Sequence, residues 1–488
     1  MRTSPRSSRR IMLAGASGLL LILSYQPFAW PLVAWVALAP LLLALDGARP
    51  RAALGLGWLC GTIGGLGVTG YWIGRAAVEY FGLGPAAATL FTMVVIQVFV
   101  APFFALFALL AARLGGGIGR PVCVAAALVV SEWVRVTASG NAWELLGHAV
   151  RAVPLLQIVD LTGAYGLSFL LTVTAAAAAE PWRRDGAPRA ALATAALALA
   201  LVTGYGSWRL QHLPAAPTVL PVGAVQGNVS NAARGDPART AAALQRYVEL
   251  SAALRPAPLL LVWPENAVAV FPAENAALLA PLHALVAAPG RALLAGAPRA
   301  GERPGVAAIY NSAYLFTADG VRPVYDKRRL LPFVERFALR PEDGPYLAGG
   351  AAEPVAVDAA RLGVLICYEI IDPPLARDLV ARGANLLVNL SNDSWFAAGA
   401  GPQQHYEIAR FRAVENRVAL LRVTNSGVSG AFDSAGREID RLPEDVAVAR
   451  VVALPLAPGG SFYTRHGDWF AAACGVLVAA AVLVSRSR

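Results

Sequence analysis

Three reactive side chains each follow a short apolar run in the second half of the chain. Glu265 follows Leu-Leu-Leu-Val-Trp-Pro, Lys327 follows Val-Tyr-Asp, and Cys367 follows Gly-Val-Leu-Ile. A run of this kind predicts a buried strand, and a strand that stops at a nucleophile can hold it at a sheet edge facing a pocket. Together the three residue types could perform acyl transfer. The thiolate would attack, the carboxylate would take its proton, and the ammonium would stabilise the oxyanion and lower the thiol pKa.

Each of these residues also has a simpler interpretation. A Glu after a strand is usually a helix cap or a solvated end, and a Lys usually points to water. For Cys367, the positions of the other three cysteines show whether a disulfide is an alternative role. Cys60, Cys123 and Cys474 lie inside apolar runs and are expected to pack as small hydrophobic residues. Cys367 is therefore alone in its part of the chain, which excludes an internal disulfide there.

The residues that must position these groups belong to a chain of uneven composition. Of 488 residues, 57% are hydrophobic and 15% charged, and the formal net charge is +10. Apolar residues concentrate in 11–206 and 469–484, with a soluble-like segment between them. This pattern indicates a membrane protein with one large extramembrane domain. Because the Arg residues flank apolar runs, a bilayer is favoured over nucleic acid as the partner. The five His residues lack the paired spacing of a metal site.

Eight apolar stretches approach the length that a bilayer requires. They are residues 10–25, 28–45, 52–74, 86–112, 120–137, 155–180, 188–206 and 468–485. We therefore expect a seven-helix membrane region at 1–213, an extramembrane domain at 214–465, and a C-terminal transmembrane helix with its tail at 466–488. A retained first helix is favoured over a cleaved signal peptide, because no clear small-residue cleavage site precedes the second stretch.

Arg residues predict the orientation of these stretches. The N-terminus carries four, and the connectors around 49–51, 113–120 and 183–189 carry two or three each. The alternate connectors at 75–85 and 138–154 carry one each. The positive-inside rule then places both termini in the cytoplasm and the large domain on the opposite side. In a bacterium this would be an inner-membrane protein with a periplasmic domain.

Strand and helix signals alternate through the large domain. Strands are expected at 219–225, 259–263, 292–297, 309–317, 321–325, 362–366, 386–390 and 419–423, and helices at 238–254, 373–382 and 403–417. Strands interleaved with helices indicate an α/β fold, and a hairpin around Asp319-Gly320 makes the sheet mixed. A two-sheet sandwich flanked by helices fits a domain of this length.

Four ordered motifs of this domain resemble those of the nitrilase (carbon–nitrogen hydrolase) superfamily. They are Trp263-Pro-Glu265, Tyr325-Asp-Lys-Arg-Arg-Leu-Leu-Pro-Phe333, Cys367-Tyr-Glu369 and Asn389-Leu-Ser-Asn-Asp-Ser-Trp-Phe396. The resemblance implies an αββα sandwich and a Glu-Lys-Cys triad at Glu265, Lys327 and Cys367.

The same resemblance implies supporting roles for four further residues. Glu335 would help to position the triad, Tyr368 and Glu369 would stand beside the nucleophile, and Trp395 would line the pocket. The residues alone leave other roles open: an ion pair with Arg336 or Arg340 for Glu335, and core packing for Trp395. His405 is expected to be structural, since a Glu-Lys-Cys site needs no His.

The whole chain, spans included, resembles the apolipoprotein N-acyltransferases, a membrane-embedded branch of this superfamily. This resemblance implies transfer of an acyl chain from a phospholipid, typically phosphatidylethanolamine, to the α-amine of the diacylglyceryl-Cys at the N-terminus of an apolipoprotein. The reaction would pass through a thioester on Cys367 and need no cofactor. A donor that resides in the bilayer independently explains why the enzyme carries membrane spans.

Two loops depart from the pattern of that family. It often places a Trp several residues after Asn228, where this chain has Ala-Ala-Arg-Gly-Asp236, and Val334 replaces the usual Gly after Pro-Phe. Two other hypotheses remain at this point. A membrane-anchored amidase would pass the thioester to water. A transporter or scaffold would only bind, with Glu132 and Asp160 as candidates for a polar path through the membrane.

Overall fold

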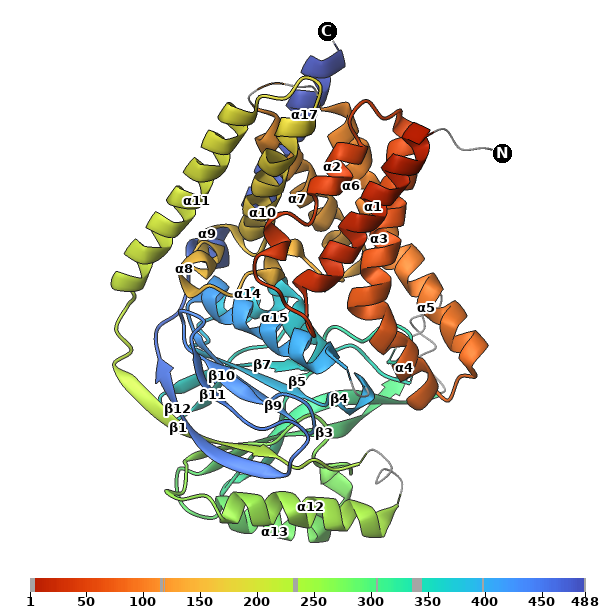
Figure 1. The fold of residues 1–488 in the computed structure, drawn as a ribbon. Helices are drawn as coiled ribbons and strands as arrows, with labels where there is room; N and C mark the ends of the chain where they lie inside the picture. Colours follow the sequence, from red (N-terminus) through yellow and green to blue (C-terminus); the bar gives the residue numbers. More distant parts are fainter. Residues whose placement is uncertain are drawn as a thin grey trace. The chain divides into compact units, whose positions relative to one another are not determined.

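The computed structural model describes residues 5–114, 117, 119–230, 236–303, 306–335, 345–396 and 399–486. The chain forms two compact units (Figure 1). We call them the helical unit, which comprises Met1–Leu213, Phe396–Gln404 and His466–Arg488, and the sandwich unit, which comprises Pro214–Trp395 and His405–Arg465. The short segment Phe396–Gln404 lies inside the range expected for the extramembrane domain but groups with the helices.

The sandwich unit contains two six-stranded sheets. In order across the first sheet, the strands are β12 (Val448–Leu456), β1 (Thr218–Gln226), β2 (Leu260–Val262), β3 (Ala292–Arg303), β4 (Val306–Thr317) and β5 (Gly320–Asp326). In the second sheet they are β11 (Glu438–Arg441), β10 (Gly430–Phe432), β9 (Ala419–Thr424), β8 (Leu386–Ser391), β7 (Ala360–Ile366) and β6 (Val355–Val357). The central strands β1, β2 and β3 run parallel, as do β7, β8 and β9.

The core of this unit lies between the sheets. Buried side chains of both sheets form one cluster, which includes Leu260 and Val262 of β2 and Val364 and Ile366 of β7. Helices α12 (Pro237–Ala252) and α13 (Ala276–Val286) supply a second cluster on the outer face of the first sheet. Helices α14 (Pro373–Ala381) and α15 (Gly401–Asn416) lie along the second sheet (Figure 1). The layers are therefore α-β-β-α, as the sequence predicts.

The predicted strands and helices of the sandwich unit are confirmed, with one difference in length. Strand β3 continues to Arg303, six residues beyond its predicted end, and pairs along its whole length with β4. The outer half of this hairpin is polar and Gly-containing, so it lacks the apolar alternation that marks a buried strand. Its pairing comes from the neighbouring strand rather than from its own composition.

The helical unit is built from one set of long helices and several short ones. In chain order they are α1 (Pro5–Ser24), η1 (Val33–Trp35), α2 (Ala39–Ala44), α3 (Pro50–Gly65), η2 (Leu66–Gly70), α4 (Tyr71–Glu79), α5 (Pro85–Phe99), α6 (Ala101–Arg113), α7 (Arg120–Ser139), η3 (Leu146–Ala149), α8 (Val153–Leu156), α9 (Val159–Thr162), α10 (Tyr165–Ala179), η4 (Glu180–Trp182), α11 (Pro188–Gln211) and α17 (Trp469–Arg486). The segments α3, η2 and α4 form one continuous helical run of 30 residues.

Among the described residues, four helical stretches are long and apolar enough to cross a bilayer. They are Pro50–Glu79, Pro85–Arg113, Arg120–Ser139 and Pro188–Gln211. A fifth is present if the pair Val153–Thr162 and Tyr165–Trp182, bent by 118°, counts as one span. Large apolar side chains such as Leu90, Leu192 and Val476 are more than 60% exposed on these helices and α17, as expected of a lipid-facing surface.

Two of the eight expected spans are not single helices. Residues 28–45 form a short 3-10 turn and the six-residue α2, because Pro31 and Pro40 lack the N–H group that a continuous helix needs. Residues 155–180 are interrupted at Gly163, whose φ of +63° is left-handed. The structure therefore does not confirm a straight span at either place, and the eight expected spans are confirmed only in part.

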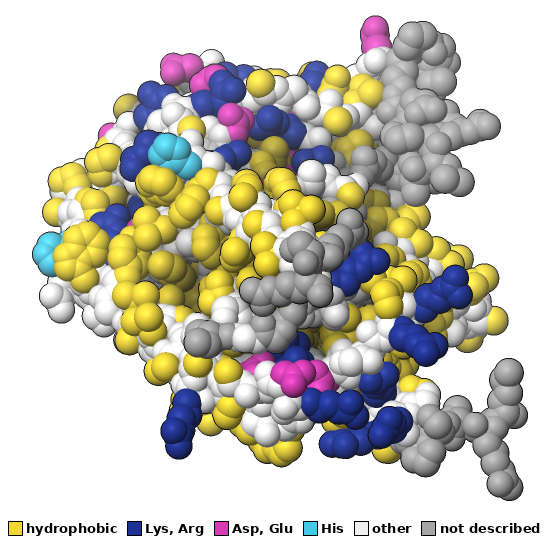
Figure 2. Space-filling model, turned by 90° about the horizontal axis from the view of Figure 1, so that it is seen from above, with side chains coloured by type: hydrophobic (Ala, Val, Ile, Leu, Met, Phe, Trp, Pro, Cys, Tyr) yellow, Lys and Arg dark blue, Asp and Glu magenta, His cyan; other side chains and the backbone are white. Residues whose placement is uncertain are grey.

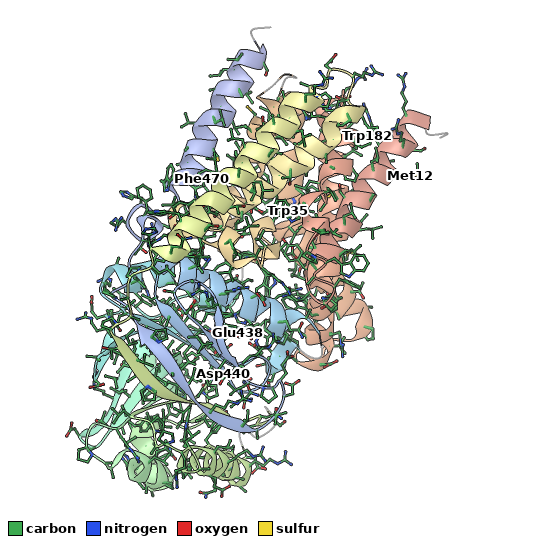
Figure 3. The ribbon with its side chains drawn as sticks, turned by 60° about the vertical axis from the view of Figure 1, so that its left-hand side comes forward. Met12, Trp35, Trp182, Glu438, Asp440 and Phe470 are labelled. Carbon is green, nitrogen blue, oxygen red and sulfur yellow. The ribbon has the colours of Figure 1, made fainter. Side chains whose placement is uncertain are left out.

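Charged side chains form a paired cluster at one end of the helical unit. Arg120 Nη1 lies 3.1 Å from Glu180 Oε1, and Arg183 Nη1 lies 2.9 Å from Asp46 Oδ1. Met12 and Trp182, both largely exposed, lie near this end (Figure 3). Seen from above, Lys and Arg side chains stand among extensive hydrophobic surface (Figure 2). Arg residues beside an exposed Trp are typical of a helix end at a membrane–water interface.

Candidate active site

Cys367 stands where β7 ends. The strand stops at Ile366, and Cys367 opens the 3-10 turn η8 (Cys367–Ile371) with a φ of +53°. The left-handed conformation is uncommon for a residue with a side chain, and strain of this kind is concentrated at functional sites. The Cys367 side chain is 3% exposed. The sharp turn thus holds the thiol at the sheet edge that the apolar run predicts.

Glu265 follows β2 in the first sheet. Strand β2 ends at Val262, and Pro264, which has no N–H to donate to the neighbouring strand, directly precedes the carboxylate. Gly296 of β3 allows the close approach of this turn, because a Cβ there would lie 2.7 Å from the Cα of Glu265. The side chain of Glu265 is 8% exposed.

Lys327 follows β5 and lies between two carboxylates. Its Nζ is 2.9 Å from Glu335 Oε1 and 3.5 Å from Glu265 Oε1, and its side chain is 1% exposed. Asn311 of β4 joins the same group, since its Nδ2 donates to Glu265 Oε1 at 2.7 Å and to Glu335 Oε1 at 3.0 Å. The ammonium and the amide thereby hold both carboxylates in place.

The charges of this group set the protonation of the thiol. Burial, together with the Glu265 carboxylate, raises the pKa of Cys367 to about 12, and Lys327 acts in the opposite direction. Burial also favours a neutral Lys327. The carboxylates of Glu335 and Glu265 outweigh that effect and keep the pKa of Lys327 well above its usual range. The resting site is therefore a thiol beside a charged ammonium, and the thiol must lose its proton as it attacks.

Replacing Glu265 by Gln is expected to separate thiol reactivity from catalysis. Loss of the negative charge should lower the pKa of Cys367, so alkylation by iodoacetamide at pH 7 should become severalfold faster. Acyl transfer should fall by about 10²–10⁴-fold, because the proton acceptor is gone. Alkylation followed by mass spectrometry across a pH series measures the first effect. Glu274→Gln, at an exposed position, serves as the control. An unchanged or slower alkylation rate would contradict the arrangement of charges.

Glu369 connects the segments that carry Lys327 and Cys367. Its Oε1 accepts from the backbone N–H groups of Arg328 at 2.6 Å and Arg329 at 2.9 Å. Its Oε2 accepts from the N–H of Ile366 at 2.7 Å and from Tyr325 Oη at 2.8 Å. Burial raises the pKa of Glu369 to about 7, while these N–H groups favour the carboxylate. Glu369 thus fixes the backbone next to both reactive residues.

Glu369→Gln is expected to destabilise the protein by about 2–4 kcal/mol, because an amide NH₂ would face N–H donors in a fully buried site. Thermal unfolding of the purified protein measures the change, and acyl transfer should fall with it. The control is Glu353→Gln, whose side chain is 71% exposed and forms an ion pair with Arg382 at the surface. A melting temperature equal to that of the control would contradict the connecting role.

The remaining predicted residues occupy less central positions. Tyr368, the residue after Cys367, is half-buried, and so is Trp395 in the turn η9 (Ser394–Phe396). The roles of both residues remain predictions. For Glu335, the alternative partners Arg336 and Arg340 lie outside the described residues, and its described ion pair is with Lys327. The changed loop around Ala232–Gly235 also lies outside the described residues.

A buried polar network that the sequence did not reveal stands behind the nucleophile. Arg422 of β9 donates from Nη2 to both oxygens of Asp393, at 2.6 and 2.7 Å, and lies 2.9 Å from His405 Nδ1. It also donates to Asn389 of β8. Burial and the Arg422 charge lower the pKa of His405 to about 4, so the ring is neutral at pH 7, in keeping with a structural role. The only sequence signal was a charged residue, Arg422, in the middle of an apolar strand.

A polar pocket of about 40 Å³ opens beside Glu265. Its wall includes Tyr247, Asn266, Asn392 and Asn425. A pocket of this size has room for a few water molecules or for one small polar group of a reactant beside Glu265.

Comparison with known proteins identifies the family. Residues 17–177 match the apolipoprotein N-acyltransferase N-terminal domain, and residues 221–452 match the carbon–nitrogen hydrolase family. The apolipoprotein N-acyltransferase of Geobacter metallireducens is 34% identical, and the alignment covers 98% of this chain and 96% of that relative. The chain belongs to the apolipoprotein N-acyltransferase family. The relative from Azotobacter vinelandii is 33% identical over 97% of this chain and 95% of its own. Among solved structures, an amidase from Nesterenkonia sp. is 21% identical and covers 51% of this chain and 94% of its own, with a TM-score of 0.39.

In this member of the acyltransferase family, the two intramembrane carboxylates have structural partners. Asp160 accepts from Tyr205 Oη at 2.6 Å and from Arg209 Nε at 2.9 Å. Glu132 accepts from the N–H of Leu146 at 2.7 Å. Each of the two carboxylates thus accepts at least one hydrogen bond within the helical unit.

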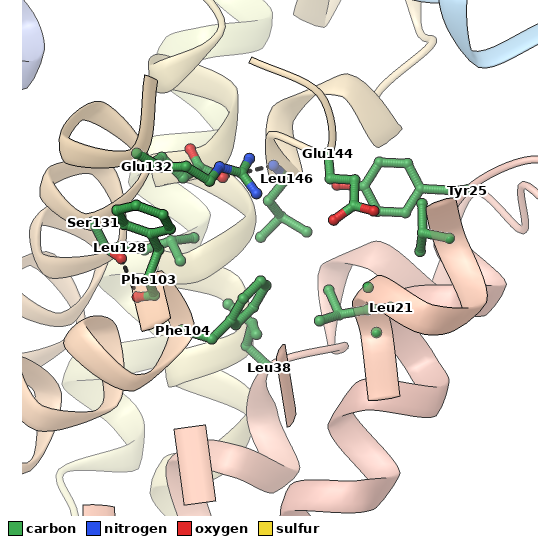
Figure 4. A pocket seen from close by; sticks show the side chains of 14 residues that line it. Leu21, Tyr25, Leu38, Phe103, Phe104, Leu128, Ser131, Glu132, Glu144 and Leu146 are labelled. Carbon is green, nitrogen blue, oxygen red and sulfur yellow. Dashed lines mark hydrogen bonds between the residues drawn. The ribbon is translucent and has the colours of Figure 1, made fainter. Parts of the chain in front are cut away.

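Glu132 also borders a small cavity in the helical unit. Glu132 and Glu144 line one side, and Phe104 and Leu38 line the other (Figure 4). The cavity holds about 20 Å³, which is room for about one water molecule. This hollow is too small for a lipid head group.

Proposed function

We propose that the protein transfers an acyl chain from a phospholipid to the α-amine of the diacylglyceryl-Cys at the N-terminus of an apolipoprotein. The observation that carries the proposal is the buried cluster of Cys367, Lys327 and Glu265 in a chain that belongs to the apolipoprotein N-acyltransferase family. A thiol, a proton acceptor and a fixed ammonium are the parts that acyl transfer through a thioester requires.

In the first half-reaction, Cys367 Sγ attacks the ester carbonyl of the lipid while Glu265 takes the thiol proton. The carbonyl becomes an oxyanion that Lys327 Nζ stabilises, since the ammonium is held beside the thiol by two carboxylates. Collapse of this intermediate breaks the ester bond. The lysophospholipid leaves with the proton from Glu265, and a thioester remains on Cys367.

In the second half-reaction, the α-amine of the acceptor attacks the thioester carbonyl, and Glu265 takes a proton from the attacking nitrogen. Collapse breaks the C–S bond, forms the amide and returns the proton to the thiolate. The polar pocket beside Glu265 supports this role, because it offers neutral groups around the position where an amine must lose its proton. Glu335, Tyr368, Glu369 and Trp395 support the site in this proposal.

The lipid donor fits the surface of the helical unit. An open groove of about 440 Å³ lies between α4 and α5 and is lined by small or flexible residues, among them Gly70, Gly74, Ala88 and Met93. Arg75 stands at its rim. We assign this groove to an acyl chain, with phosphatidylethanolamine as the expected donor.

The membrane arrangement is also part of the proposal. We place 1–213 in the membrane with seven helical segments, 214–465 in the periplasm, and 466–488 as the last membrane segment with a cytoplasmic tail. The Arg bias of the connectors supports this orientation in a bacterial inner membrane. The breaks at 28–45 and 155–180 make two of the eight segments bent or divided rather than straight.

Incubation of the purified protein with phosphatidylethanolamine vesicles tests the function. Intact mass spectrometry should find one acyl chain on the peptide that contains Cys367, and a diacylated lipopeptide should then remove it as a triacylated product. No acyl adduct would favour a binding scaffold. Loss of the adduct to water at an equal rate with and without lipopeptide would favour an amidase.

A further inference from the structure

Gln404 makes four hydrogen bonds inside the helical unit. Its Oε1 accepts from Trp143 Nε1 at 2.8 Å and from Trp72 Nε1 at 3.3 Å. Its Nε2 donates to the carbonyl oxygens of Gln26 and Val68, each at 3.0 Å. An amide has two acceptor sites and two N–H groups, so every hydrogen-bonding position is used. The side chain is 4% exposed.

The chemistry of the four partners determines the orientation of this amide. An indole N–H can only donate and a backbone carbonyl can only accept, so a flipped amide would lose all four bonds. The partners come from the connector after α1, from η2, from α4 and from the loop after α7. Because η2 and α4 belong to one continuous helical run, this buried side chain contacts three segments that are distant in sequence.

An aromatic cluster holds the other end of the same segment. Phe396 is fully buried, with its ring centroid 4.8 Å from that of Trp72 and 5.7 Å from that of Trp143. Between these ends, the N–H of Ala400 donates to Tyr71 Oη at 2.7 Å. Trp143 itself is held by Arg135, which donates to its carbonyl oxygen at 2.6 Å. Phe396, Ala400 and Gln404 are thus each held by residues of the helical unit.

The residues that flank this segment belong to the site of the sandwich unit. Asp393 precedes it and His405 follows it, and the two side chains lie 3.3 Å apart, with Arg422 bonded to both. Asp393 also accepts from Ser391 Oγ at 3.0 Å, at the end of β8, the strand that pairs with the strand of the nucleophile. Gln404 lies in the first turn of α15 (Gly401–Asn416), directly before His405, so its hydrogen bonds hold the turn of the helix that carries one member of this network.

We propose that Gln404 is a positioning residue for acyl transfer, which fixes the first turn of α15 and through it His405 in the polar network behind the nucleophile. This inference rests on the proposed function. A shift of α15 should matter for a bulky lipid ester, which must be aligned with the thiol, and much less for a small soluble reagent.

Gln404→Met tests this role, because methionine keeps the length of the side chain and removes all four hydrogen bonds. The rate of Cys367 acylation from phosphatidylethanolamine vesicles should fall at least about tenfold. Alkylation of Cys367 by iodoacetamide should stay within about twofold of the unmodified protein across the same pH range, because the thiol site is intact. Gln403→Met, the same change at the neighbouring half-buried glutamine, should leave acylation unchanged. Equal acylation rates in Gln404→Met and the unmodified protein would overturn the proposal, and so would a parallel fall in alkylation.

A double-mutant cycle with Trp143→Phe provides an independent readout. Phe keeps the aromatic contact and removes one indole N–H, so it should reduce acylation less than Gln404→Met and add little to it in the double variant. Fully additive losses would overturn the proposal.

Hydrogen exchange distinguishes failure of the anchor from failure of the proposed function. The peptide that contains Ala400 and Gln404 should lose protection in Gln404→Met, while peptides from β7 and β8 should keep theirs. Unchanged protection at Ala400 would overturn the anchoring. An unmodified protein that forms no thioester would instead refute the proposed function. The hydrogen-exchange result would still show whether Gln404 holds this segment in place.

Discussion

Cys367→Ala is expected to abolish acyl transfer, with a loss of at least about 10⁴-fold in the rate of product formation. No other group in the site can form the covalent intermediate, since Glu265 and Lys327 serve as proton acceptor and oxyanion donor. The acyl adduct on the protein should disappear together with lysophospholipid release. Intact mass spectrometry and lysophospholipid quantification measure both effects.

The matched control changes the other three cysteines. A variant with Cys60→Ala, Cys123→Ala and Cys474→Ala should retain acyl transfer, because all three are structural thiols of the helical unit. The fold of Cys367→Ala should be intact, since the substitution removes one sulfur atom from a turn. Substantial activity in Cys367→Ala would refute the thioester mechanism.

Lys327→Met should combine a large catalytic loss with a large loss of stability. Removal of the ammonium leaves Glu265 and Glu335 buried and close together without a counter-charge. Leaving a buried charge uncompensated costs about 3–5 kcal/mol, and losing an oxyanion donor costs about 10²–10³-fold in rate. Thermal unfolding and single-turnover acylation measure the two effects.

A second substitution separates these two roles. In the double variant Lys327→Met/Glu335→Gln, one buried negative charge is also removed, so part of the lost stability should return while acylation stays low. If acylation recovered together with stability, the ammonium would have only a structural role. If Lys327→Met alone lost tenfold or less in rate, it could not be the oxyanion donor.

The candidate triad could be predicted because each residue follows a local pattern. Glu265 and Cys367 come after short apolar runs, whose length and composition depend only on neighbouring residues, and Lys327 follows the partly exposed strand β5 of the hairpin around Asp319-Gly320. The same local signals predicted most strands and helices of the sandwich unit. The motifs around them then indicated the superfamily, and comparison with relatives identified the apolipoprotein N-acyltransferase family.

The helices were predicted less completely, because hydropathy alone does not report where a helix breaks. Stretches 28–45 and 155–180 are apolar enough to suggest spans, yet prolines divide the first and Gly163 bends the second. A window of mean hydropathy averages over these positions, whereas a missing N–H or a left-handed φ acts at a single residue.

The sequence by itself therefore determined which residues stand at the strand ends, and only the tertiary structure decided what surrounds them. Asn311 bridges two carboxylates, Glu369 binds backbone groups some 40 residues earlier, and Gln404 contacts three separate segments. These contacts depend on the register of the sheets and on the packing of distant helices, which no local pattern of residues encodes. The residue types of the candidate triad could be identified in the sequence. The residues that hold them in place could not, because they make long-range contacts that form only when the protein folds.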